Sequence, residues 1–254
     1  MLDIQRIPLF RDNYAYLLTD RADGTVAIVD PGTEGPVIEA IDANGGRLDL
    51  VLLTHHHADH IGGAPALKAR YGARVVGPQS DRGRLPDLDQ GVGDGDSVAI
   101  GSATARVIAT PGHTSGHIAF WVEAANAVFC GDTLFSLGCG RVFEGTYPEM
   151  WESLLALRAL PDDTLVYCGH EYTEANGRFA ESVDPGNAAL EAEIAEDRAL
   201  RARGEATVPC HLGVEKRTNP FLRADDPGLA AALGMAGKDA AEVFAVLRQR
   251  KDTF

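Results

Sequence analysis

The sequence is poor in basic residues and in cysteine. Lys and Arg total 23 against 37 Asp and Glu, which gives a formal net charge of −14. Binding to nucleic-acid phosphates or to an anionic membrane needs a basic face, so the composition argues against both kinds of partner. The cysteines are widely spaced with no CxxC pair, which favours buried, reduced thiols over a disulfide framework: Cys130, Cys139, Cys168 and Cys210.

Long apolar runs are also missing. No run reaches the ~20 residues of a membrane-spanning helix. Residues 1–18 mix charged with apolar residues and lack the apolar core and cleavage site of a secretory signal. We therefore expect a soluble, cytoplasmic protein and a monomer. With 254 residues and 45% hydrophobic content, the chain can form one large domain or a domain with a smaller second one.

Short apolar runs alternate with glycine- and proline-marked turns over the first two-thirds of the chain. Their length and β-branched content predict strands, and helix-like stretches at 62–71 and 148–160 separate some of them. This alternation predicts an α/β fold. The expected strands lie within 24–32, 48–54, 73–77, 103–112, 118–122, 127–132 and 164–169.

The pattern changes after about residue 172. We see no convincing strand there, and three segments near 173–183, 187–203 and 238–250 read as helices. The middle one begins at Asn187, a good N-cap, and stops at Gly204. The sequence therefore predicts a catalytic domain over 1–172 and a small helical domain over 173–254.

A run of histidines follows the apolar segment at 48–54. It has the form HxHxDH, in which alternate residues of an extended chain point the same way, so that His55 and His57 can bind one metal ion. The chain then turns and presents Asp59 and His60. His56 should point away from its neighbours and is left out. A histidine-rich polar loop without a metal is the weaker interpretation, because four of the eight histidines fall within six residues.

Three more donors follow later strand ends, where function-bearing loops of α/β folds are expected. They are His113, Asp132 and His170. Each alone would be an ordinary turn residue. We expect the remaining histidines, His117 and His211, to be structural.

The number of donors distinguishes one metal ion from two. A catalytic zinc uses three protein ligands, so seven donors exceed one site. If Asp132 bridges, one ion takes His55, His57 and His113, and the other takes Asp59, His60 and His170. Imidazole and carboxylate without thiolate suit catalytic zinc, iron or manganese. Two ions at ~3.5–4 Å would yield hydroxide from water at neutral pH and polarise a carbonyl, which predicts hydrolysis without a protein nucleophile.

The order of these motifs resembles the metallo-β-lactamase superfamily, and within it the glyoxalase II, or hydroxyacylglutathione hydrolase, family. The likeness rests on THHHADH, TPGHTSGH, GDTLF and GHEYT. It extends to DNYAYLL (12–18), VDPG (29–32), GCGRVFEGT (138–146), TNPFLR (218–223) and RQRKDTF (248–254).

The resemblance implies an αββα sandwich followed by the helical domain. It also implies the same seven ligands, with Asp59 and Asp132 as the carboxylates of the catalytic centre and a metal-bound hydroxide as nucleophile. Two divalent ions per chain are expected, zinc first, with iron or manganese as alternatives. The implied reaction hydrolyses S-D-lactoylglutathione to D-lactate and glutathione, which removes methylglyoxal.

Five positions match the residues that hold glutathione in that family: Arg141, Phe143, Tyr172, Arg248 and Lys251. Phe143 departs from the family, which usually has tyrosine there. Independently, the basic residues at 248–251 suit a ligand with more carboxylate than amine charge. Without such a ligand they would be a solvated helix end that favours the helix dipole.

Three other functions fit parts of the sequence. A persulfide dioxygenase shares HxHxDH but holds one iron. A nuclease on this fold conflicts with the acidic charge. A non-catalytic metal-binding module would have to explain why so many donors occur without a cysteine ligand.

Overall fold

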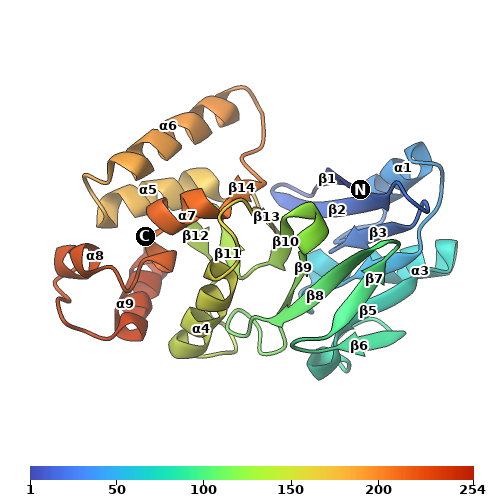
Figure 1. Cartoon of the computed structure of the whole chain (residues 1–254), viewed down its shortest axis with the longest axis horizontal. Coiled ribbons are helices and arrows are strands. Elements are labelled where there is room, and N and C mark those ends of the chain that lie inside the picture. The colour runs from blue at the N-terminus through green and yellow to red at the C-terminus, as the bar shows by residue number, and fades with distance from the viewer. The chain divides into compact units, whose positions relative to one another are not determined.

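The computed structural model describes all residues, Met1–Phe254, and the chain divides into two compact units. The first unit is Met1–Ala109 with Gly116–Gly131, and the second is Thr110–Ser115 with Asp132–Phe254. None of the helices has the length and apolar content needed to cross a membrane. Figure 1 shows the elements of both units.

The first unit contains a six-stranded mixed sheet in the order β1 to β6, antiparallel from β1 to β3 and parallel from β3 to β6. Helix α1 packs on β1 and β2, and α3 packs on β4 and β5, over a core that includes Ile28, Ile41 and Leu67. The bounds are β1 Leu2–Leu9, β2 Asn13–Asp20, β3 Val26–Val29, α1 Gly35–Ala43, β4 Leu50–Leu52, α2 Ala58–Ile61, α3 Ala64–Tyr71, β5 Arg74–Pro78 and β6 Gln90–Val92.

Four further strands of this unit form an antiparallel meander, β7 Ser97–Ile100, β8 Ala103–Ala109, β9 Ile118–Val122 and β10 Ala127–Gly131. Their apolar side chains alternate with exposed ones along β7 and most of β8, whereas β10 is buried throughout. Alternation is typical of a strand with one solvated face. All the strands expected within this unit are confirmed, and three of them, β3, β4 and β8, are a few residues shorter than the apolar runs.

The second unit is mainly helical. Its strands are β11 Leu134–Phe135, β12 Gly138–Cys139, β13 Leu165–Cys168 and β14 Cys210–His211, and β11 pairs with β12 and β13 with β14. Its helices are α4 Tyr147–Arg158, α5 Thr173–Val183, α6 Ala188–Ala202, α7 Leu212–Thr218, α8 Pro227–Ala232 and α9 Ala240–Asp252. Helix α5 lies along α6, and α4 packs against α9 (Figure 1).

The three helices expected after residue 172 are confirmed as α5, α6 and α9. Asn187 is the N-cap of α6, and its side chain accepts a hydrogen bond of 3.2 Å from the amide of Leu190. The expectation of no strand in this region is wrong, because Cys210–His211 pairs with β13. A two-residue strand is held by its partner and leaves no periodic pattern in the sequence.

Candidate metal centre

The HxHxDH run lies in the first unit, in the loop after β4 and in the short helix α2. His55 and His60 are buried, whereas His57 and Asp59 are partly exposed. The Nε2 of His55 is 3.1 Å from the Nδ1 of His57, so these two ring nitrogens converge on one point, as ligands of a shared metal ion would. The structure therefore brings the first pair of predicted donors together.

Asp30 supports this loop from the end of β3. Its backbone is left-handed, with φ of 49°, and its carboxylate accepts hydrogen bonds from the Thr54 amide at 2.8 Å and the Thr54 hydroxyl at 2.6 Å. The Nδ1 of His60 is 3.1 Å from the same carboxylate. This bond fixes the ring of His60 and leaves its Nε2 as the metal-ligating atom.

Thr54 fixes His55 in the same way. Its hydroxyl proton points to Asp30, so the oxygen accepts from the Nδ1–H of His55 at 3.0 Å. The lone pair of His55 therefore lies on Nε2, the atom that faces His57. Asp30, His55 and His60 are also close enough to form a three-donor group, but the oxygens of Asp30 are occupied as hydrogen-bond acceptors. We interpret Asp30 as a support of the ligands and not as a ligand.

His56 turns away from the donors, in agreement with its exclusion. Its Nδ1 is 3.1 Å from the buried carboxylate of Asp81, which also binds Arg84 at 2.6 Å. His117 stacks on the ring of His55, with 4.7 Å between centroids and 25° between planes. Both histidines thus contact the loop or its ligands without offering an atom to a shared metal position.

Asp59 is held by the first residue of β2. The Nδ2 of Asn13 donates to Asp59 Oδ2 at 2.9 Å. Gly32 lies against the backbone of Asp59, where a Cβ would come within 1.9 Å of the carbonyl oxygen. Only glycine permits this approach, which explains the last residue of VDPG.

The second unit contains three of the predicted donors, His113, Asp132 and His170. One oxygen of Asp132, Oδ2, is 3.4 Å from the Nε2 of His113 and 3.3 Å from the Nε2 of His170. The Nδ1 of His113 donates to the carbonyl of Arg141 at 2.8 Å, which leaves Nε2 to bind a metal. A carboxylate placed between two imidazoles fits the bridging position expected of Asp132.

The residues expected to hold glutathione also lie in the second unit. Phe143 is 61% exposed, and its ring centroid is 5.2 Å from that of His113. Tyr172 is 37% exposed, and its ring stacks on that of His170 with 4.6 Å between centroids and 6° between planes. These aromatic rings cover two of the donors, while Arg141 has a side chain that is 62% exposed.

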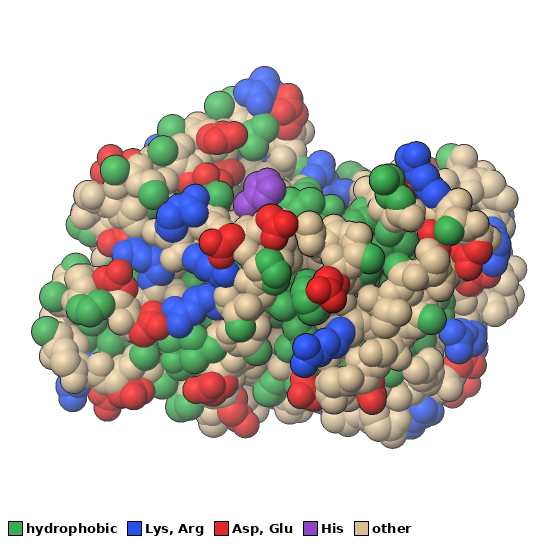
Figure 2. All heavy atoms as spheres, viewed as in Figure 1, with side chains coloured by type: hydrophobic (Ala, Val, Ile, Leu, Met, Phe, Trp, Pro, Cys, Tyr) green, Lys and Arg blue, Asp and Glu red, His purple; other side chains and the backbone are tan.

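Arg248 and Lys251 are less accessible than a solvated helix end would be. Arg248 is 3% exposed, and its guanidinium donates to the carbonyl of Cys139 at 2.8 Å. Lys251 donates to the carbonyl of Ala175 at 2.9 Å. Burial, with Arg248, Arg178 and Arg141 nearby, lowers the pKa of Lys251 to about 8. In Figure 2, Lys and Arg side chains lie among Asp and Glu side chains and form no continuous basic surface on that face.

Comparison with known proteins identifies the family of the chain. Residues 9–170 match the metallo-β-lactamase superfamily, and residues 171–254 match the hydroxyacylglutathione hydrolase C-terminus. The chain belongs to the hydroxyacylglutathione hydrolase family of the metallo-β-lactamase superfamily.

Relatives named hydroxyacylglutathione hydrolase align over the whole chain. The Methylococcus capsulatus protein is 55% identical over 254 residues, covering 100% of this chain and 99% of the relative. The Rhodospirillum rubrum protein is 53% identical over 253 residues, with 100% and 99% covered. Among solved structures, ETHE1 from Myxococcus xanthus has a TM-score of 0.70 at 28% identity, covering 97% of this chain and 90% of that one.

These comparisons confirm the expected superfamily, the metallo-β-lactamase fold, the helical C-terminal region and an enzyme of the hydrolase family. They favour the hydrolase over the persulfide dioxygenase, because the C-terminal match belongs to the hydrolases. The junction of the two matches, at residues 170 and 171, lies close to the boundary expected from the sequence. The compact units divide differently, since Asp132–Phe254 forms one of them with Thr110–Ser115.

Three supporting residues had no assigned role in the sequence interpretation: Asn13, Asp30 and Thr54. Asn13 and Asp30 fall within the motifs DNYAYLL and VDPG, which marked only the family resemblance. Thr54 directly precedes the histidines. A hydrogen-bond partner cannot be assigned from one sequence when it lies 24 residues away, as Asp30 does from Thr54.

Proposed function

We propose that the chain holds two divalent metal ions, zinc first, with iron or manganese as alternatives. One ion would be bound by His55, His57 and His113 and the other by Asp59, His60 and His170, with Asp132 bridging. The hydrogen bonds on the Nδ1 atoms of His55, His60 and His113 support this assignment, because they leave Nε2 as the ligand.

We further propose that the substrate is S-D-lactoylglutathione and that the products are D-lactate and glutathione. The observation on which this rests is the full-length similarity to proteins named hydroxyacylglutathione hydrolase. When bound, the ions would supply Lewis-acid chemistry, activating a water molecule and polarising the thioester carbonyl. A thiol with a pKa of about 8.5 leaves readily near neutral pH, so no side chain is needed as a general acid.

The second unit would bind the glutathione part. Arg141 and Lys251 would pair with its carboxylates, while Phe143 and Tyr172 would cover its peptide. Arg248 would hold this surface in place through its hydrogen bond to the carbonyl of Cys139 and its ion pair with Asp252. In domain terms, residues 1–172 would perform the hydrolysis and residues 173–254 would contribute to substrate binding. We expect a cytoplasmic monomer that binds no nucleic acid or membrane.

The test measures metal content and thioester turnover on one preparation. Wild-type protein should hold about two ions per chain and hydrolyse S-D-lactoylglutathione. His57→Ala should lower kcat/KM at least tenfold by removing a ligand. Metal-replete wild type without turnover would remove the substrate assignment, and a smaller fall in the variant would count against the ligand assignment.

The same preparation tests the dioxygenase alternative. One iron per chain, together with oxygen consumption on a glutathione persulfide, would replace the hydrolase proposal. Two ions per chain and release of D-lactate would support it.

A further inference from the structure

A buried turn connects β11 to β12 in the second unit. At this turn Leu137 is fully buried and has a left-handed backbone, with φ of 55°. Such a conformation is unfavourable for a residue with a branched side chain and persists only where the surroundings fix it. The neighbouring Ser136 is 2% exposed. The polar backbone groups of this turn therefore need partners from within the protein.

Three side chains supply these partners. Asn176 of α5 donates to the carbonyl of Ser136 at 3.0 Å. Glu215 of α7 accepts from the amide of Leu137 at 2.9 Å. Asn219, directly after α7, donates to the carbonyls of Phe135 at 3.2 Å and Gly138 at 2.9 Å, and to the same oxygen of Glu215 at 2.9 Å.

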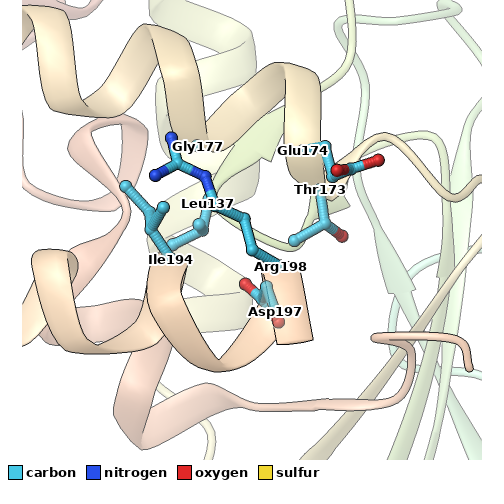
Figure 3. Close-up of a pocket in the computed structure, with 7 residues that line it drawn as sticks. All are labelled: Leu137, Thr173, Glu174, Gly177, Ile194, Asp197 and Arg198. Atoms are coloured by element: carbon cyan, nitrogen blue, oxygen red, sulfur yellow. The ribbon is translucent and has the colours of Figure 1, made fainter. Parts of the chain in front are cut away.

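All three are at least nine-tenths buried: Asn176, Glu215 and Asn219. Water therefore cannot replace the hydrogen bonds that they make. The side chain of Leu137 is fixed separately, in an apolar cluster with Ala180, Leu190 and Ile194. Figure 3 shows Leu137 and Ile194 on the wall of a small pocket that Asp197 also lines.

In the chain, the turn lies between Asp132, which is a predicted donor, and Arg141, whose carbonyl accepts a hydrogen bond from the donor His113. Asp132 precedes β11 and Arg141 follows β12. The amide of Gly140 donates to the carbonyl of Thr133 at 3.1 Å, which closes the segment on itself. A Cβ at Gly140 would lie 2.0 Å from the carbonyl oxygen of Asp132, so the two ends are in contact. A shift of the turn would therefore move Asp132 and the carbonyl that orients His113.

We propose that Glu215 and Asn219 are positioning residues for Asp132 and His113, acting through the turn between β11 and β12. The proposal rests on the proposed metal centre. It gives a role to the start of the TNPFLR motif, which supplies no metal ligand. Neither residue touches a donor, so each acts through the backbone of the turn.

At this turn Glu215 acts as a hydrogen-bond acceptor more than as a negative charge. Its Oε2 accepts both of these hydrogen bonds, and its carboxyl group also interacts with the thiol of Cys210. Burial raises the pKa of Glu215 to about 7. The amide oxygen of glutamine can accept the same two bonds, whereas leucine fills similar space with no acceptor. Glu215→Gln and Glu215→Leu therefore separate the acceptor from the volume.

The experiment compares these two variants with wild type and with Asp239→Ala, which removes the N-cap bond to Ala241 at the start of α9. Hydrogen exchange of the peptide 132–141 reports the turn directly. Competition with a zinc chelator reports the metal centre. Circular dichroism verifies that each variant is folded.

We expect Glu215→Leu to accelerate exchange of the Leu137 amide at least tenfold and to weaken zinc binding about 10- to 100-fold, the range for supports of metal ligands. Glu215→Gln should stay within about threefold of wild type, and Asp239→Ala should leave both readouts unchanged. If Glu215→Leu does not fold, Asn219→Ala replaces it with the same expectation.

Two results would overturn the proposal: a folded acceptor-less variant with wild-type exchange and zinc affinity, or an equal effect in Asp239→Ala. Misfolding of both Glu215→Leu and Asn219→Ala would also count against it, because it would make the two residues general requirements of the fold. Wild-type protein that binds no zinc would instead refute the metal centre. The exchange measurement would then still decide whether Glu215 fixes the turn.

Discussion

Asp30 accepts both polar hydrogens of Thr54, the amide at Oδ1 and the hydroxyl at Oδ2. The hydroxyl is thereby directed away from His55 and can only accept from that ring. Since Oδ2 also binds His60, one carboxylate sets the orientation of two imidazoles. In the proposed pairing these imidazoles serve different ions.

Asp30→Asn should weaken metal binding about 10- to 100-fold. The substitution replaces one acceptor oxygen of the carboxylate by an NH2 group, which cannot accept the hydrogen bonds that this oxygen receives. Zinc affinity measured with a competing chelator checks this, alongside kcat/KM. The backbone change is minimal, since asparagine tolerates the left-handed conformation. Affinity equal to wild type would mean that Asp30 does not orient the ligands.

His56→Ala should leave about two metal ions bound per chain, because His56 is directed to Asp81. His57→Ala should hold less metal under the same conditions. The two variants form a matched pair of neighbouring histidines. Equal loss of metal from both would place His56 among the ligands.

The sequence predicts a set of donors but assigns no role to the residues that support them. His55, His57 and their partners follow from spacing and strand ends, because side chains two apart in an extended segment share a face. The bond from Asp30 to Thr54 joins the ends of two neighbouring strands, and such pairing depends on tertiary structure. In the fold, the long periodic helices α5, α6 and α9 were predictable. The short elements β14 and α7 were not, since they hold only two and seven residues.

Phe143→Tyr should lower KM for S-D-lactoylglutathione a few-fold while leaving kcat within about twofold. The ring is exposed and contacts His113, so an added hydroxyl meets solvent and can donate one hydrogen bond to the peptide part of the substrate. Steady-state kinetics check this. A change in kcat without a change in KM would contradict a role in glutathione binding.

Asp197→Asn should stabilise the protein at alkaline pH and stabilise it by a smaller amount at pH 5. Burial raises the pKa of Asp197 from 3.8 to about 8, and four acidic groups add to the effect: Glu171, Glu193, Glu196 and Glu215. The native state thus retains a proton that the unfolded chain has released. Its contribution to stability is complete below pH 3.8 and is lost as pH rises through about 8.

Urea unfolding at pH 5 and pH 9 measures this difference. Glu39→Gln on α1 serves as the control, because Glu39 is exposed and its substitution removes a carboxylate from the surface instead of from the interior. The free energy of unfolding should fall between the two pH values in wild type more steeply than in Asp197→Asn. Parallel pH profiles would refute the protonation of Asp197.

The four cysteines should be unreactive in the native protein. All are buried and none forms a disulfide. Burial raises the pKa of Cys139 to about 11 and that of Cys168 to about 12, and the thiolate is the reactive form. A chromogenic disulfide reagent at pH 8 should titrate less than one thiol per chain before unfolding and all four in guanidinium. Rapid reaction of the native protein would show that a thiol is accessible.

The burial of Arg248 affects how any substitution there is interpreted. Its guanidinium joins the last helix to Cys139, on the same hairpin that connects Asp132 to Arg141. Removing it would leave a buried carbonyl without its donor as well as remove a cation. A weaker affinity for glutathione in such a variant would therefore have two causes that the measurement does not separate: the loss of a cation and the disturbance of the hairpin. Arg141, whose side chain is largely in solvent, is the cleaner probe of electrostatic attraction to the substrate.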